Sequence, residues 1–89
     1  MLNKLDRLME EKHENQNVFF KELFCTRLKE LRAEKGLSQN ETAQKLGCAV
    51  STYANWEQGR REPSIYDIYH LMYVFEIDAN ELFNMDSLS

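Results

Sequence analysis

The segment Gly36–Ser64, GLSQNETAQKLGCAVSTYANWEQGRREPS, contains the start and stop signals of two short helices. Ser38 and Glu41 match a capping box, in which the hydroxyl accepts a backbone N–H and the carboxylate bonds back to the first residue. Gly47 and Gly59 each end a helical pattern, because glycine has no Cβ to clash in the left-handed conformation that follows a helix. The predicted helices cover residues 39–46 and 50–57. Only three residues join them, which is typical of a helix-turn-helix.

Similar signals on either side of this segment predict three further helices. A second capping box, Ser64-Ile-Tyr-Asp67, follows Pro63, which a helix cannot cross. Asp78-Ala-Asn-Glu81 is a third capping box, and Asn17 can cap the segment that ends at Gly36. These helices are predicted at residues 18–35, 65–75 and 79–84, and the leucines within residues 2–13 suggest an additional amphipathic helix.

The composition restricts the chain to one small helical domain. Its 89 residues include only three glycines and one proline, which argues against a turn-rich all-β fold. An apolar share of 43% and an aromatic share of 11% are enough for a folded core. No apolar run approaches the ~20 residues that span a bilayer, and the charged N-terminus lacks a signal-peptide pattern. We therefore expect a cytoplasmic protein that does not bind membranes.

The distribution of charge matters more than the net charge of −4. Residues 26–64 carry a balance of +2, whereas residues 65–89 contain five acidic side chains and neither lysine nor arginine. An anionic nucleic-acid backbone would be tolerated only by the middle of the chain. The acidic C-terminal part is expected to face away from it, or toward a protein.

Several stretches carry a resemblance to a known family. Arg27-Leu-Lys-Glu-Leu-Arg32, Gly36-Leu-Ser-Gln39, Leu46-Gly47 and the run from Ser51 to Ser64 are similar to the phage-repressor and Cro type of helix-turn-helix regulators, the XRE-like family. The resemblance covers roughly residues 22–83, with glycines, proline, caps and apolar positions in register. It implies an all-α, compact five-helix, lambda-repressor-like domain at residues 18–84, after an N-terminal helical extension at residues 1–17 and before a short tail at residues 85–89.

The resemblance implies that the helix beginning near Val50 enters the major groove of DNA. Val50, Ser51 and Asn55 would face the bases, and an asparagine amide can bond adenine in a bidentate way. Ala49 replaces the hydroxyl residue that commonly caps this helix, so base reading by its first turn is expected to be weak. Tyr53 replaces an aliphatic core residue, and whether its hydroxyl emerges at a phosphate is left open.

Two other roles carry over from the resemblance. Gln39 at a helix N-terminus, and Arg60 and Arg61 in the following basic loop, match positions that hold DNA phosphates. Arg32 and Glu57 match an ion pair that bridges the first and third helices of the family domain.

These features predict a DNA-binding transcriptional regulator, in particular a repressor, that binds double-stranded operator DNA as a homodimer. Two-fold pairing would place two recognition helices ~34 Å apart along the duplex. Tyr66, Tyr69 and Tyr73 fall on one face of the predicted helix 65–75 and are a candidate dimer surface, because aromatic residues are enriched at interfaces. The N-terminal extension at residues 1–17 is the competing dimer element, and plain exposed tyrosines or a frayed helix are the alternatives.

Another class of function remains open on sequence grounds. An antitoxin-like or adaptor-like protein-interaction module would bind a protein partner, or an antirepressor, through the acidic residues 76–89. No paired catalytic groups or glycine-rich phosphate loop predict an enzyme. Cys25, Cys48, His13 and His70 lack metal-ligand spacing, so we expect no metal or cofactor, and redox sensitivity of Cys48 stays an alternative to an inert role.

Overall fold

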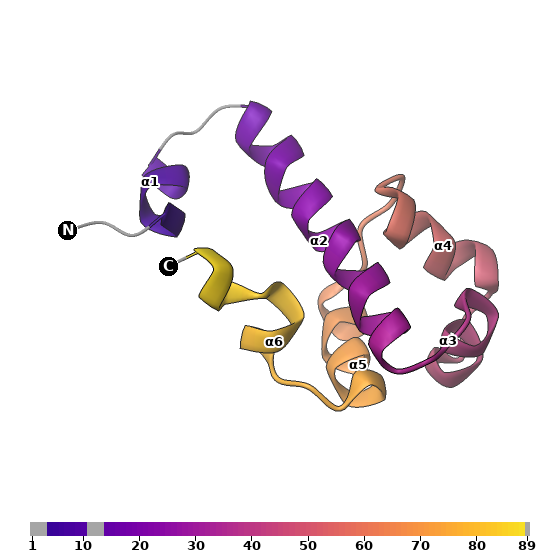
Figure 1. The fold of residues 1–89 in the computed structure, drawn as a ribbon. Coiled ribbons are helices and arrows are strands. Elements are labelled where there is room, and N and C mark those ends of the chain that lie inside the picture. Colours follow the sequence, from indigo (N-terminus) through magenta and orange to yellow (C-terminus); the bar gives the residue numbers. More distant parts are fainter. Residues whose placement is uncertain (1–3, 11–13, 89) are drawn as a thin grey trace.

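The computed structural model describes residues 4–10 and 14–88, and every regular element among them is helical, which confirms the all-α prediction (Figure 1). The elements are α1 (Lys4–Glu10), α2 (Glu14–Glu34), α3 (Gln39–Leu46), α4 (Val50–Gln58), α5 (Ile65–Phe75), α6 (Ala79–Phe83) and the short 3-10 helix η1 (Met85–Leu88). Within the described ranges, no helix has the length and apolar character needed to cross a membrane.

The 21-residue helix α2 is the element around which the others are arranged (Figure 1). Helices α3 and α4 pack against each other, and α4 also packs on α2. Helix α6 also packs on α2, and α5 packs on α3. The helix pair α3–α4 is therefore held by contacts to both α2 and α5.

The predicted starts and stops of the short helices are confirmed in atomic detail. Ser38 begins α3 and Ser64 begins α5, each with a complete capping box. Asp78 does the same for α6. Gly47 and Gly59 end α3 and α4 in the left-handed conformation, with φ of 72° and 74°. These local signals suffice to set the boundaries because each satisfies backbone groups that the helix itself leaves free.

Other boundaries differ from the prediction. Helix α2 begins at Glu14, so Asn17 lies inside it and does not cap it as predicted. No glycine or proline interrupts residues 14–17, so the helix continues backward past the expected start. Helices α5 and α6 end at non-glycine residues, Glu76 and Asn84, which adopt left-handed φ values of 57° and 51°. The predicted stripe of residues 2–13 lies partly outside the described residues.

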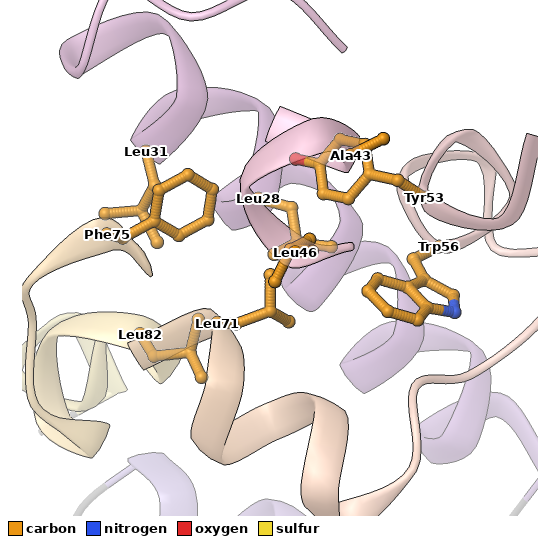
Figure 2. Packing of buried hydrophobic residues seen from close by; sticks show 9 residues of the cluster. All are labelled: Leu28, Leu31, Ala43, Leu46, Tyr53, Trp56, Leu71, Phe75 and Leu82. Atoms are coloured by element: carbon orange, nitrogen blue, oxygen red, sulfur yellow. The ribbon is translucent and has the colours of Figure 1, made fainter. Parts of the chain in front are cut away.

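The core draws side chains from α2 through α6 (Figure 2). It consists of Leu28, Leu31, Ala43, Leu46, Tyr53, Trp56, Leu71, Phe75 and Leu82. Leu46 and Trp56 occupy this core, as the family resemblance implies. Thr42, where the family commonly has leucine, is fully buried and donates its hydroxyl to the Ser38 carbonyl at 2.9 Å. Because α4 inserts two aromatic rings here, its rotation about its own axis is fixed by core packing.

Candidate nucleic-acid interface

The connection between α3 and α4 is stabilised by backbone hydrogen bonds. The N–H of Gly47 donates to the Gln44 carbonyl at 3.1 Å, and that of Cys48 donates to the Ala43 carbonyl at 3.0 Å. These bonds satisfy the last carbonyls of α3 in the manner of a Schellman turn. The chain then enters α4 directly, so the turn positions α4 against α3 without a flexible linker.

Helix α4 has a buried face and an outward face. Tyr53, Trp56 and Glu57 are buried, which leaves the predicted base-contacting residues on the other side. Val50 is 43% exposed, Ser51 is exposed and Asn55 is half-buried. None of these three side chains is therefore among the buried residues of α4.

Two exposed polar residues of α4 were missed by the sequence reasoning. Thr52 and Gln58 are both exposed, and each lies three residues from Asn55 along the helix. Residues three apart share a helix face, so helical periodicity about Asn55 was the signal that could have found them. The first turn also lacks a side-chain cap at Ala49, as the sequence predicts.

Glu57 is a buried carboxylate that connects three elements. Its side chain accepts hydrogen bonds from Nε of Arg32 at 2.6 Å and from Nη2 at 3.2 Å. Arg32 also donates from Nη1 to the Leu37 carbonyl at 3.1 Å, in the turn before α3. The Gln39 amide donates to Glu57 at 3.0 Å. The α2 C-terminus, the α3 N-terminus and the C-terminal half of α4 are thereby joined at one carboxylate.

The charge state of this cluster follows from its surroundings. Burial alone would raise the pKa of Glu57, but the hydrogen bonds and positive charge of Arg32, together with the Gln39 amide, lower it below its usual value. The bond to Glu57 raises the pKa of Arg32, against its own burial. Both groups are therefore charged at neutral pH, and the cluster carries no net charge.

Gln39 and Tyr53 both lie beside Glu57, and the sequence raised a phosphate contact for each of them. The Gln39 side chain is half-buried and directs one amide hydrogen to Glu57, which leaves its second hydrogen and its backbone N–H. Tyr53 is fully buried, so its hydroxyl does not emerge toward a phosphate. Among the described residues this hydroxyl completes no hydrogen bond. Burial, followed by the neighbouring Glu57 carboxylate, raises the pKa of Tyr53.

Arg60 and Arg61 lie in the loop that follows α4, and both are exposed. Their backbone N–H groups donate to the Asn55 carbonyl at 2.9 and 3.4 Å, which places the loop against the last turn of α4. Within the described part of the chain, neither guanidinium forms an ion pair with a carboxylate. Their exposure makes both cations accessible to an external anion close to the C-terminal end of α4.

The three tyrosines lie on a different element, α5. Tyr66, Tyr69 and Tyr73 are 71%, 67% and 81% exposed, whereas Leu71 and Phe75 of the same helix are buried. The ring of His70 lies between two of them, with centroids 5.6 Å from Tyr66 and 6.4 Å from Tyr73. The outward face of α5 is therefore an aromatic stripe, defined here as Tyr66, Tyr69, His70 and Tyr73.

Neither cysteine has the character of an activated thiol. Burial raises the pKa of Cys25, whose Sγ donates to the Trp56 carbonyl at 3.2 Å. Burial and the nearby charge of Asp67 raise the pKa of Cys48. A raised pKa reduces the thiolate fraction on which oxidation depends. In the described ranges, no three His, Cys, Asp or Glu side chains gather as metal ligands would, and His13 lies outside those ranges.

Two short helices joined by a tight turn and held on a longer helix define a helix-turn-helix protein. The chain belongs to the helix-turn-helix family HTH_3, whose match covers residues 28–82. The family relationship predicted from the sequence is thereby confirmed. The named relatives are transcriptional regulators, a class of DNA-binding proteins and not of enzymes, as the sequence predicts.

The relatives give the extent of the similarity. The chain is 45% identical over 56 residues to the HTH-type transcriptional regulator AnsR of Bacillus subtilis, an alignment that covers 63% of this chain and 48% of AnsR. It is 28% identical over 60 residues to the cryptic phage CTXphi transcriptional repressor RstR of Vibrio cholerae, covering 67% of this chain and 54% of RstR. The chain thus spans about half the length of these two relatives.

A solved structure shows the same fold. The crystal structure of an HTH_3 family transcriptional regulator from Vibrio cholerae superposes with a TM-score of 0.69 at 30% sequence identity. The superposition covers 78% of this chain and 39% of that protein.

Proposed function

We propose that this protein is a repressor that binds a specific double-stranded DNA operator by inserting α4 into the major groove. The observation that carries this proposal is the division of α4 into two faces. Its inner face is anchored by Trp56 and by the Glu57 cluster, while its outer face presents Val50, Ser51 and Asn55. A helix held in one rotation, with small and polar groups outward, meets the requirement for reading base edges.

The residues of the outer face would make different contacts with the bases. Asn55 is the side chain best suited to base recognition, because its amide can donate and accept to adenine at the same time. Ser51 adds a hydroxyl, and Val50 can contact a thymine methyl group. Thr52 and Gln58 extend the same face by their exposure. Because the first turn lacks a long polar side chain, we expect a large share of the affinity to come from phosphates.

Phosphate contacts are assigned to the two ends of the helix pair. Arg60 and Arg61 are exposed cations beyond the C-terminus of α4, without a carboxylate partner among the described residues. Gln39 lies at the N-terminus of α3, where backbone N–H groups favour an anion. Its bond to Glu57 restrains its amide beside that terminus. These contacts would position α4 on the duplex without reading its sequence.

Operator binding is expected to need two copies of the chain. One domain offers one recognition helix, and a two-fold pair would present two of them to half-sites about one turn of DNA apart. The aromatic stripe on α5 is the surface that we assign to this pairing, because it exposes three tyrosine rings on one helix face beside the half-buried ring of His70. The repressor name of RstR supports repression as the regulatory outcome.

A binding selection over randomised duplexes tests the proposal. The expected result is enrichment of a palindrome whose half-sites are about one helical turn apart. Affinity for the enriched duplex should fall steeply between about 50 and 200 mM salt, because each phosphate contact releases counterions. Failure to enrich any duplex at low salt would reject DNA recognition and favour a protein-interaction module that binds through the acidic residues 76–89.

A further inference from the structure

An apolar groove of about 590 Å³ lies beside α4, outside the outward face assigned to DNA. Its walls come from the N-terminal half of α2, the loop after α4, and helices α5 and α6. Phe20 and Phe24 of α2 face it together with Ile68 and Phe83. The rings of Phe24 and Phe83 are stacked, with centroids 5.6 Å apart, and Phe83 is still 37% exposed. The volume is in the range of small-molecule sites, roughly 300–1,000 Å³.

The lining of the groove also includes the Cys25 thiol, whose hydrogen bond is made within the protein. Trp56 and Cys25 both line it, and the Cys25 thiol is bonded to the Trp56 carbonyl at 3.2 Å. Gly59 lies so close that a Cβ added there would stand 3.3 Å from the Cys25 sulfur. This part of the groove therefore offers a ligand mainly apolar contact.

A cluster of cations lies at one end of the groove. Lys21 and Arg61 line it, and a second hollow of about 440 Å³ beside it is lined by the same two residues together with Arg60 and Glu62. In the described part of the chain, none of the three cations forms an ion pair. Three positive side chains against one carboxylate give this end an attraction for anions. The stem of Lys21, an exposed side chain, passes over Gly59, where a Cβ added to the glycine would stand 3.4 Å from the Lys21 Cδ.

We infer that this groove binds an amphipathic monoanion, a single carboxylate or sulfonate group on an aliphatic or aromatic body. The body occupies the wall of Phe20, Phe24 and Ile68, and the anionic group pairs with Lys21 and Arg61. A neutral apolar molecule would leave the cations unused, and a nucleotide would bury polar groups against the phenylalanines without partners. Charge complementarity and volume together select this chemical class.

Binding in the groove has a consequence that rests on the proposed function. Arg61 is shared between the groove and the loop that we assign to DNA phosphates. A bound anion would occupy the guanidinium that a phosphate needs, so ligand and operator would weaken each other's binding by the same factor. The groove would then act as an effector site of the regulator.

The test uses the intact protein and the fluorescence of Trp56, which is the single tryptophan of the chain and lines the groove. Decanoate is titrated below its micelle concentration, and decyltrimethylammonium serves as the cation with the same chain. We expect a saturable change in Trp56 fluorescence with decanoate and no such change with decyltrimethylammonium. Lys21→Gln should raise the decanoate Kd by about tenfold, the loss of one charge-assisted contact. Lys35→Gln removes one charge beyond the other end of α2 and should leave the Kd unchanged.

Two results would overturn the inference. One is an equal response to the cationic chain or an equal Kd for both lysine variants. The other is a Trp56 signal that depends on protein concentration without ligand and tracks dimer formation in sedimentation, since that would assign the groove to a second copy. Because the titration contains no DNA, it is independent of the proposed function. A protein that binds decanoate as expected but no duplex would retain the groove site and lose the proposed function.

Discussion

Arg32 and Glu57 form a two-pronged ion pair between α2 and α4, with Nε–Oε2 and Nη2–Oε1 distances of 2.6 and 3.2 Å. Glu57 is 1% exposed, so water does not compete for its carboxylate. The same arginine holds the Leu37 carbonyl, and the same glutamate holds the Gln39 amide. The pair therefore determines how α4, the turn before α3 and the N-terminus of α3 stand relative to one another.

Removing one partner of this pair should destabilise the fold. We expect Arg32→Ala to lower the free energy of unfolding by about 3 kcal/mol, because it leaves Glu57 buried without its counter-charge. Replacing both residues, as Arg32→Met with Glu57→Leu, should restore much of the loss because no buried charge remains. Urea unfolding at pH 7 measures all variants. If the double variant lost as much unfolding free energy as the two single variants together, the interaction between Arg32 and Glu57 would not be the source of the effect.

The same pair makes stability depend on acid pH. Glu57 has a lowered pKa in the folded state, so its contribution is fully present above the unfolded value of about 4.3 and is lost as the pH falls through the folded pKa. The unfolding midpoint in urea should therefore decrease below about pH 4.3. Glu57→Gln should reduce this dependence, whereas Glu62→Gln, at an exposed loop position, should not. An NMR titration of the Glu57 carboxyl in the unaltered protein checks the sign if the first variant folds poorly.

The left-handed helix ends allow opposite predictions at two positions. Glu76 is exposed with φ of 57°, so Glu76→Gly should relieve backbone strain and stabilise the protein by about 1 kcal/mol, or roughly 4–8 °C in Tm. Gly59→Ala should destabilise it by more than about 1 kcal/mol, since φ is +74° and the new Cβ meets the Cys25 sulfur. Thermal unfolding followed by circular dichroism measures both. A loss of stability in Glu76→Gly would mean that its side chain contributes more than the strain costs.

The contrast between these helix ends shows what could be predicted from the sequence. Ser38 and Ser64 start helices, and Gly47 and Gly59 stop them, through interactions within one turn of chain. Such local interactions can be predicted from the order of residues. Glu76 adopts the same left-handed conformation, with its backbone N–H directed to the Met72 and Tyr73 carbonyls, but without a glycine to mark the helix end in the sequence.

The candidate site likewise has features that could be predicted from the sequence and features that depend on how the helices pack. The ion pair between Arg32 and Glu57 and the outward placement of Asn55 were implied by the resemblance to the helix-turn-helix family. The bond from Gln39 to Glu57 spans 18 residues and depends on how α3 rests against α4, which no spacing encodes. The full burial of Tyr53 depends likewise on the depth of the core beneath α4.

The aromatic stripe on α5 yields a prediction about assembly. Tyr69→Glu places a charge at a position that is 67% exposed, so the monomer should keep its stability. If two copies pair through this face, the buried charges should raise the dimer dissociation constant by tenfold or more and weaken duplex binding in parallel. Sedimentation equilibrium and duplex titration measure the two effects. Thr26→Glu, at an exposed position of α2, is the matched control. An unchanged dimer in Tyr69→Glu would move the pairing surface elsewhere, with the N-terminal residues 1–17 as the next element to test.

Base reading and phosphate binding can be separated by two single substitutions. Asn55→Ala should cost about 1–3 kcal/mol on the selected operator and little on unrelated duplexes, because the contact that we propose for the amide involves one base pair. Arg60→Ala should weaken all duplexes alike and reduce the slope of log affinity against log salt by about one, because a phosphate contact carries no sequence information. Fluorescence anisotropy over a salt series, with the operator and its single-base variants, measures both quantities. If Asn55→Ala kept the full sequence preference, base reading would have to be reassigned along the outward face of α4, to Thr52 or Gln58.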